Sequence, residues 1–294
     1  MITTEIFDSR YKKLHIKPGS SKCPGCCGLI HDRYILEAIN ESGKNVIMKA
    51  YAGCGGGTLS PEIPHYGMNF SSGPDVAAGV ALALEVLGKS DIVVICGNGD
   101  GHVSDISFNK TSACAERNEN MIQYCVDNEA YMNTGIQKSG STPIGAWTTT
   151  TPWGKKTNKK YLPMIMAQHR IPYVATLSIA YPKEFKNSFK KALEMKGYRY
   201  LHILMPCPTG WRYPSQKGIK VATLSVQTWM WPLYEVENGV FKLMVKPKPK
   251  PVKEYLELQG RFKDLSEEDI QNYQKDVDRR RMKLLEDDGK NILY

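Results

Sequence analysis

The sequence predicts an α/β fold in which helices flank a mostly parallel central sheet. Two apolar, β-branched runs, at 91–96 and 121–128, have the continuous hydrophobic pattern of strands that are buried on both faces. A helix-like stretch at 106–118 separates them, and each run ends in polar or glycine-rich residues. This strand–helix–strand order continues to about residue 206 and is typical of parallel sheets, in which ligands bind beyond the carboxyl ends of the strands.

The other elements follow from hydrophobic periodicity and from turn residues. In chain order, the remaining predicted elements are a helix over 29–40, a strand over 45–53, a helix over 74–87, a strand over 173–179, a helix over 182–197 and a strand over 200–206. Pro74 suits the first turn of its helix, because proline lacks the N–H that a helix start leaves unpaired.

The last fifty residues differ in character from the rest. Residues 246–251 read KPKPKP, which is a stiff, extended connector. A charged helix is predicted to begin after Ser266, with Asp269 at its third position in a variant of the capping box. We therefore expect one domain over 1–245 and a C-terminal arm over 246–294 that contacts another subunit.

Composition and charge restrict the class of protein. The 294 residues are 41% apolar and 23% charged, as in ordinary globular proteins, and no run approaches the ~18 apolar residues of a membrane span. The start, MITTEIFDSR, lacks the apolar core of a signal peptide, so we expect a cytoplasmic protein without membrane association. Residues 151–220 hold fourteen Lys and Arg against two Glu, which fits a solvated face, a phosphate-bearing ligand or an acidic protein partner. No nucleic-acid-binding motif accompanies this charge.

Polar residues follow the two central strands where each strand ends. Gly99-Asp100-Gly101 comes after the first strand, and Asn128 and Ala130 come after the second. Mg²⁺ prefers oxygen ligands, commonly one or two carboxylates together with phosphate oxygens. The Asp100 carboxylate, the Asn128 amide oxygen and the Ala130 backbone carbonyl can therefore form a magnesium site that holds a diphosphate. Two ordinary turns would also explain these residues.

The eight cysteines fall into two groups. Cys23 and Cys26 form a closely spaced pair, and Cys54 and Cys207 lie in glycine- or proline-rich loops. Four loop thiolates can bind zinc or an iron–sulfur cluster, and one pair with two distant single cysteines favours the cluster. Four unrelated free thiols are the alternative. Cys96, Cys114 and Cys125 lie in an apolar run or a helix and are expected in the core.

The motifs as a set resemble the β subunit of pyruvate:ferredoxin oxidoreductase and its 2-oxoacid:ferredoxin oxidoreductase relatives. The resemblance covers most of the chain, through CPGC at 23–26, GNGDG at 97–101, YMNTGIQ at 131–137, SGSTP at 139–143, PCPTGWR at 206–212 and PVKEYLELQGRF at 251–262.

This resemblance implies a thiamine-diphosphate-binding fold and oxidative decarboxylation of a 2-oxoacid, with electrons passed through a [4Fe–4S] cluster to ferredoxin and coenzyme A as the usual acyl acceptor. It implies that Asp100, Asn128 and Ala130 hold Mg²⁺, and that Asn133 lies beside the thiamine ring. The cluster ligands implied are Cys23, Cys26, Cys54 and Cys207, with Cys27 a possible replacement for Cys26. The glutamate that activates thiamine is implied to come from a partner subunit.

Two segments depart from the family pattern. Residues 102–120 are less glycine-rich than in the family, and 58–73 differ around the position of a family histidine. Both are expected near the path by which a substrate reaches the cofactor. The 2-oxoacid therefore stays open: pyruvate is the default, with oxalate and other 2-oxoacids as alternatives. The rival functions are a zinc-stapled structural or nucleic-acid-binding protein and a thiamine decarboxylase without redox function.

Overall fold

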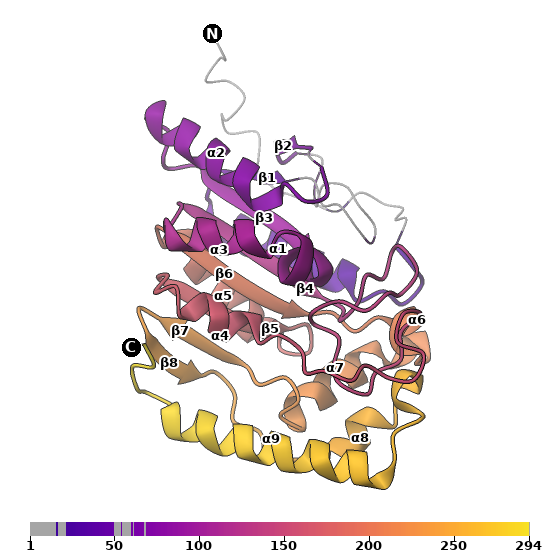
Figure 1. Cartoon of the computed structure of the whole chain (residues 1–294). Coiled ribbons are helices and arrows are strands. Elements are labelled where there is room, and N and C mark those ends of the chain that lie inside the picture. The colour runs from indigo at the N-terminus through magenta and orange to yellow at the C-terminus, as the bar shows by residue number, and fades with distance from the viewer. Residues whose placement is uncertain are drawn as a thin grey trace.

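A computed structural model describes residues 16, 22–49, 54, 60, 62–67 and 69–293. Within these residues, eight strands form one sheet in the order β2-β1-β3-β4-β6-β5-β7-β8 (Figure 1). The strands are β1 (Val46–Lys49), β2 (His65–Tyr66), β3 (Val93–Gly99), β4 (Met121–Asp127), β5 (Tyr173–Ser178), β6 (Tyr198–Leu204), β7 (Tyr234–Glu237) and β8 (Val240–Leu243). Strands β1 to β6 pair in parallel, and β7 and β8 add an antiparallel edge.

Helices cover both faces of the sheet. The α-helices are α1 (Gly28–Ser42), α2 (Gly73–Val86), α3 (Phe108–Glu116), α4 (Leu162–Ala167), α5 (Pro182–Glu194), α6 (Pro208–Trp211), α7 (Gly218–Gln227), α8 (Val252–Leu256) and α9 (Glu267–Asp287). Apolar side chains of α1 and α5 form a core with one face, and those of α2, α3, α4 and α7 form a second core with the other. Strands β3, β4 and β6 are buried along almost their whole length, because both of their faces are covered.

The structure confirms the predicted α/β class and the predicted central strands. The sequence reading missed the hairpin of β7 and β8, although Asn238-Gly239 between them is a strong two-residue hairpin signal. Both residues have positive φ, 46° and 86°, which the turn requires. The antiparallel pair extends the sheet beyond the strand–helix–strand region and ends it at β8.

The C-terminal arm packs against its own chain. Helix α8 contacts α7, and α9 contacts α8 and β8, so the arm follows the side of the molecule opposite α2 (Figure 1). Ser266 caps α9 as predicted: its hydroxyl accepts from the Asp269 N–H, and the Asp269 carboxylate accepts from the Ser266 N–H. Most of α9 stays solvent-accessible, since Val277 is its buried residue. None of the helices in the described part of the chain is long and apolar enough to cross a bilayer.

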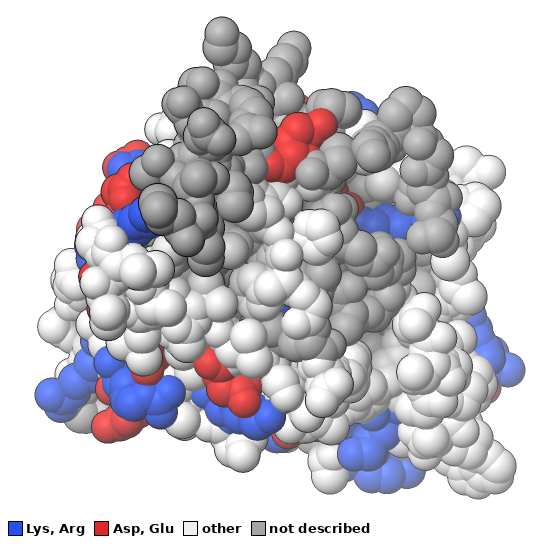
Figure 2. Space-filling view, turned by 90° about the horizontal axis from the view of Figure 1, so that it is seen from above, with Lys and Arg blue, Asp and Glu red and all other residues white. Residues whose placement is uncertain are grey.

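Many cations of the basic segment 151–220 form ion pairs with acids elsewhere in the chain. Lys186 and Lys190 pair with Glu41, and Lys191 pairs with Glu235 and Glu237. Among the residues coloured in Figure 2, Lys and Arg form separate groups, several of them beside Asp or Glu. The excess positive charge of the segment is therefore partly neutralised within the fold.

Candidate functional site

The predicted magnesium ligands meet at the carboxyl ends of β3 and β4. The two strands are neighbours, with Gly99 opposite Val126, so Asp100 and Asn128 follow at the same edge of the sheet. Asp100 is 1% exposed, and Asn128 and Ala130 are each 4% exposed. A π-helical turn, His102–Ile106, begins two residues after Asp100. Gly101 permits this close packing, because a Cβ there would lie 2.5 Å from the ring of Tyr131.

The spacing of three polar atoms fits a divalent cation. One amide atom of Asn128 lies 3.0 Å from Asp100 Oδ1 and 2.8 Å from the carbonyl oxygen of Ala130. Rotating the Asn128 amide by 180° exchanges its nitrogen and oxygen. In one orientation the nitrogen donates to the two oxygens, and in the other the amide oxygen lies beside them. Adjacent ligands of Mg²⁺ are about 3 Å apart, since the metal–oxygen distance is about 2.1 Å in an octahedron. Both distances match adjacent oxygen ligands of one magnesium ion, and they also match two hydrogen bonds from the amide nitrogen.

The electrostatic surroundings of Asp100 also favour a bound cation. The Ser139 hydroxyl donates to Asp100 Oδ2, but no Lys, Arg or His of the described residues forms an ion pair with this carboxylate. Burial, followed by the negative charge of Asp127, raises the pKa of Asp100 well above its usual value. A buried carboxylate without a cation is costly, and a divalent metal ion would remove that cost.

The neighbouring acids, in contrast, are fully paired. Glu129 accepts from Lys159 at 2.8 Å and from Arg261 at 2.6 Å, and His202 Nε2 lies 2.8 Å from Asp127 Oδ2. Burial alone would raise the pKa of Asp127, but Lys159 and His202 outweigh it and lower that pKa. Arg261 comes from the C-terminal arm, so the arm contributes to the ion pairs behind the site.

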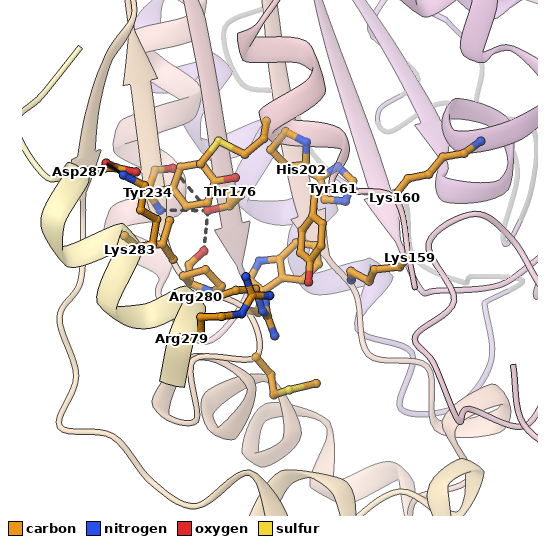
Figure 3. A pocket seen from close by; sticks show the side chains of 16 residues that line it. Lys159, Lys160, Tyr161, Thr176, His202, Tyr234, Arg279, Arg280, Lys283 and Asp287 are labelled. Carbon is orange, nitrogen blue, oxygen red and sulfur yellow. Dashed lines mark hydrogen bonds and ion pairs between the residues drawn. The ribbon is translucent and has the colours of Figure 1, made fainter. Parts of the chain in front are cut away.

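Lys159 and His202, the partners of these acids, also line a cavity of about 530 Å³ (Figure 3). His202 lines it from β6, and Lys159 and Trp231 line it from loops. Arg279, Arg280 and Lys283 reach it from α9. The ring of His202 stacks on Trp231 with centroids 5.2 Å apart. None of the predicted magnesium or cluster ligands lines this cavity, so it is separate from the predicted cofactor site.

The four cysteines predicted as cluster ligands lie close to one another. After burial, the largest causes that raise the pKa of Cys54 to about 12 are the charges of Cys207, Cys26 and Cys23, and Asp100 also contributes. After burial, Cys26 and Cys23 likewise raise the pKa of Cys207. In the described part of the chain, no three His, Cys, Asp or Glu side chains are grouped as ligands of a single metal ion. The thiols are thus neighbours, spread more widely than around one ion.

Backbone donors already point at two of these sulfurs. The Gly28 N–H donates to Cys26 Sγ and the Gly210 N–H donates to Cys207 Sγ, each at 3.3 Å. Such bonds stabilise a thiolate and tune iron–sulfur clusters. Cys27 is 2% exposed and packs near Tyr213, with its sulfur 4.0 Å from the tyrosine hydroxyl, so it belongs to the core. Cys96, Cys114 and Cys125 are buried as predicted.

Asn133 is on the exposed loop that follows Ala130. The loop closes on itself through a bridge between Tyr131 and Gln137. In the same loop, Met132 packs against Gly210: a Cβ at Gly210 would lie 2.2 Å from the methionine sulfur. The Asn133 side chain is solvent-accessible. Its predicted place beside the thiamine ring remains a prediction.

Sequence reasoning overlooked three residues that position the site. They are Ser139, which holds Asp100, Trp211, whose indole N–H donates to the Asn128 carbonyl oxygen at 2.7 Å, and Arg261, which holds Glu129. All three lie in the family-like segments SGSTP, PCPTGWR and PVKEYLELQGRF. The signal was present, but only the fold shows that these segments meet at one place.

Comparisons with known proteins agree with this geometry. A family model described as "Thiamine pyrophosphate enzyme, C-terminal TPP binding domain" matches residues 64–203. The chain is 41% identical over 275 residues to pyruvate synthase subunit PorB of Methanothermobacter marburgensis, covering 90% of this chain and 94% of the relative. It is also 41% identical over 280 residues to ketoisovalerate oxidoreductase subunit VorB of Pyrococcus furiosus, covering 89% of each chain.

A solved structure shows the same fold. It is a 2-oxoglutarate:ferredoxin oxidoreductase from Magnetococcus marinus with 2-oxoglutarate, coenzyme A and succinyl-CoA bound; the TM-score is 0.59 at 21% identity, over 75% of this chain and 84% of that one. The identities to the curated relatives over almost the whole length decide the family, and they set aside the structural and nucleic-acid-binding alternatives. The chain belongs to the family of thiamine-diphosphate-binding β subunits of 2-oxoacid:ferredoxin oxidoreductases.

Proposed function

We propose that this subunit holds thiamine diphosphate through a Mg²⁺ ion bound by Asp100, Asn128 and the Ala130 carbonyl. The subunit serves in oxidative decarboxylation of a 2-oxoacid, pyruvate by default, with electrons leaving through a [4Fe–4S] cluster to ferredoxin. The observation that carries the proposal is the spacing of 3.0 and 2.8 Å between one Asn128 amide atom and the other two ligands. A second support is the buried Asp100 carboxylate without a cation among the described residues.

The residues of this chain position the metal and the cofactor. The Ser139 hydroxyl orients the Asp100 carboxylate by donating to Oδ2, which leaves Oδ1 toward Asn128. The Trp211 indole N–H donates to the Asn128 backbone carbonyl and so fixes the position of that residue. Thiamine diphosphate, when bound, supplies the electron sink for the carbanion formed by loss of CO₂. Asn133 is proposed to contact the thiamine ring from the loop 131–137.

The cluster is proposed to bind Cys23, Cys26, Cys54 and Cys207. Cys54 is close enough to Asp100 for the carboxylate to raise the pKa of its thiol, so cluster and diphosphate share one region of the molecule. Burial keeps the free thiols protonated, and iron binding would release those protons. A cluster at this place is well positioned to accept electrons from the cofactor.

The rest of the reaction needs partners. We propose that a partner subunit supplies the glutamate that activates thiamine, that the arm 246–294 contributes to the subunit contact, and that coenzyme A takes the acyl group. Ferredoxin is proposed to dock on the basic surface near α5. Isolated, the subunit should not turn over any 2-oxoacid.

The test is purification of the whole complex without oxygen, followed by a screen of 2-oxoacids with and without coenzyme A, read by viologen reduction. We expect reduction with at least one 2-oxoacid, and four irons with acid-labile sulfide per β subunit in addition to clusters of partner chains. One zinc without sulfide at the four cysteines would contradict the cluster. Decarboxylation without viologen reduction would instead support a thiamine decarboxylase without redox function.

A further inference from the structure

A group of buried polar atoms without partners lies on the α2 side of the sheet, beside the proposed cofactor site. Lys49 Nζ, Asn98 Nδ2, Tyr66 Oη and both ring nitrogens of His102 are buried and have no hydrogen-bond partner among the described residues. Lys49, Asn98 and His102 are 3%, 0% and 1% exposed. A buried polar atom without a partner is costly, and a charged one more so, so this number of them in one place needs an explanation.

Strand pairing brings these side chains to one face. Lys49 ends β1 and pairs with Tyr66 in β2, while Met48 pairs with Ile95 in β3, so Lys49 lies beside Cys96. Side chains alternate along a strand, and Asn98 therefore points to the same face as Cys96. The Asn98 orientation is fixed, because its Oδ1 accepts from Cys96 Sγ at 3.0 Å and from Gln123 at 3.5 Å. Its amide nitrogen is therefore the atom that is left without a partner.

Three nitrogens converge on the start of α2. A Cβ at Gly73 would lie 2.7 Å from Asn98 Nδ2, 3.0 Å from His102 Nε2 and 3.2 Å from Lys49 Nζ. Phe70 packs edge-on against the His102 ring, with centroids 5.4 Å apart, and keeps the ring in this place. Gly73 is the first residue of α2, whose N-terminus adds a partial positive charge.

The charges of the surroundings are also one-sided. No carboxylate of the described residues forms an ion pair with Lys49, and the first-turn acid of α2, Asp75, pairs with Lys110 at 3.3 Å. Burial lowers the pKa of Lys49, as expected for an ammonium group without a counter-charge. What is missing from the group is a negatively charged acceptor.

We propose that Lys49, Asn98, His102 and the N-terminus of α2 form a binding site for a small oxyanion of the carboxylate type. A carboxylate offers up to four acceptor positions, which suits a lysine, an amide and a histidine that all face one place. A Cβ at Gly73 would contact all three nitrogens and displace them from this arrangement.

Two sources of such a carboxylate are distinguishable. It belongs either to the substrate, as a second acidic group of a dicarboxylic 2-oxoacid, or to a free small anion. The first source rests on the proposed function; anion binding by itself does not. Binding is therefore measured without turnover, and substrate preference is measured separately.

The binding experiment follows thermal unfolding of the intact complex in malonate or inorganic phosphate, at constant ionic strength set with chloride. We expect a saturable rise in the unfolding temperature of the wild type. Lys49→Met and Gly73→Ala should abolish the rise. Gly79→Ala is the matched control, because it lies in the same helix with nothing within 4 Å of the added Cβ, and it should respond as the wild type does.

The kinetic arm compares Lys49→Met with the wild type on 2-oxoacids with one and with two carboxylates. If the substrate is the source, KM for dicarboxylic 2-oxoacids rises about tenfold or more and monocarboxylic ones are unaffected, as expected for loss of a charged hydrogen bond. Unchanged KM values with loss of anion stabilisation assign a free anion. A wild type without any response to either anion would overturn the site. So would a Lys49→Met variant that responds normally, or one that loses only affinity for thiamine diphosphate.

Discussion

The indole N–H of Trp211 donates to the backbone carbonyl of Asn128 at 2.7 Å. Trp211 lies four residues after Cys207 and ends α6, the short helix after β6, whereas Asn128 is the residue that follows β4. One hydrogen bond thus connects the segment of a proposed cluster ligand with a proposed magnesium ligand. The Cys207 carbonyl also accepts from the Trp211 N–H at 2.9 Å, so the tryptophan is held from both sides.

The first prediction concerns this bond. Trp211→Phe keeps most of the buried ring but leaves the Asn128 carbonyl without its donor, at a cost of about 1–3 kcal/mol. We expect roughly tenfold weaker retention of Mg²⁺ and thiamine diphosphate, measured by titration of the cofactor-depleted complex. Trp229→Phe is the control, because its indole bonds to Pro247 away from the site. Equal effects of the two substitutions would mean that Trp211 has only a packing role.

Asp100→Ala should abolish retention of thiamine diphosphate while the fold persists. The substitution removes the one carboxylate of the proposed metal shell, but this carboxylate is buried without a cation, so its loss costs the cofactor-free protein little. The amount of thiamine that stays bound through gel filtration measures cofactor retention, and circular dichroism measures whether the fold persists. Asp75→Asn, on the surface of α2, is the control and should retain the cofactor. Unchanged thiamine affinity in Asp100→Ala would refute the metal anchor.

Adjacent cysteines give a sharp test of the cluster. Cys26→Ala should lower the iron content by up to four atoms per β subunit, whereas Cys27→Ala should leave it unchanged. The reason is that Cys26 is partly exposed near the other thiols and Cys27 is enclosed in the core. Iron and sulfide analysis of the anaerobically purified complex measures the cluster content of both variants. The reverse pattern would make Cys27 the ligand.

Breaking the ion pair from the arm should destabilise the subunit. Arg261 and Glu129 are 3% and 4% exposed, and Arg261→Met leaves one Glu129 oxygen buried without its partner. We expect a loss of about 3–5 kcal/mol in denaturant unfolding, as for other broken buried pairs. Adding Glu129→Gln should recover part of it. Arg279→Met removes an exposed pair with Asp276 and should cost less than about 1 kcal/mol; a similar cost for both arginines would contradict the argument from burial.

Charge reversal on α5 tests ferredoxin docking. Lys190→Glu with Lys191→Glu should slow ferredoxin reduction and flatten its salt dependence, because an acidic partner would lose attraction. These lysines also pair with Glu41, Glu235 and Glu237, so unfolding must be checked in parallel. Lys263→Glu with Lys275→Glu makes the same change in net charge on a different surface. Equal ferredoxin kinetics in the two variants would exclude docking at α5.

Much of the site was readable from the sequence, because local chemistry marks it. Asp100 and Asn128 each follow a buried strand, and such ends meet at one edge of a parallel sheet. The cysteine spacing and the family motifs gave the proposed cluster ligands in the same way. The β7–β8 hairpin was missed in spite of the signal of Asn238-Gly239.

Only the tertiary structure showed which distant residues act together. Ser139, Trp211 and Arg261 lie 39, 83 and 132 residues from their partners Asp100, Asn128 and Glu129. Likewise, nothing in the sequence around Lys49, Gly73 or His102 indicates that their polar atoms converge without acceptors. Sequence patterns report the chemistry of neighbours along the chain, whereas hydrogen bonding and desolvation depend on neighbours in space. The sequence alone therefore determined the family and suggested the proposed ligands, and the fold decided which distant side chains hold those residues and which buried charge among the described residues is left without a partner.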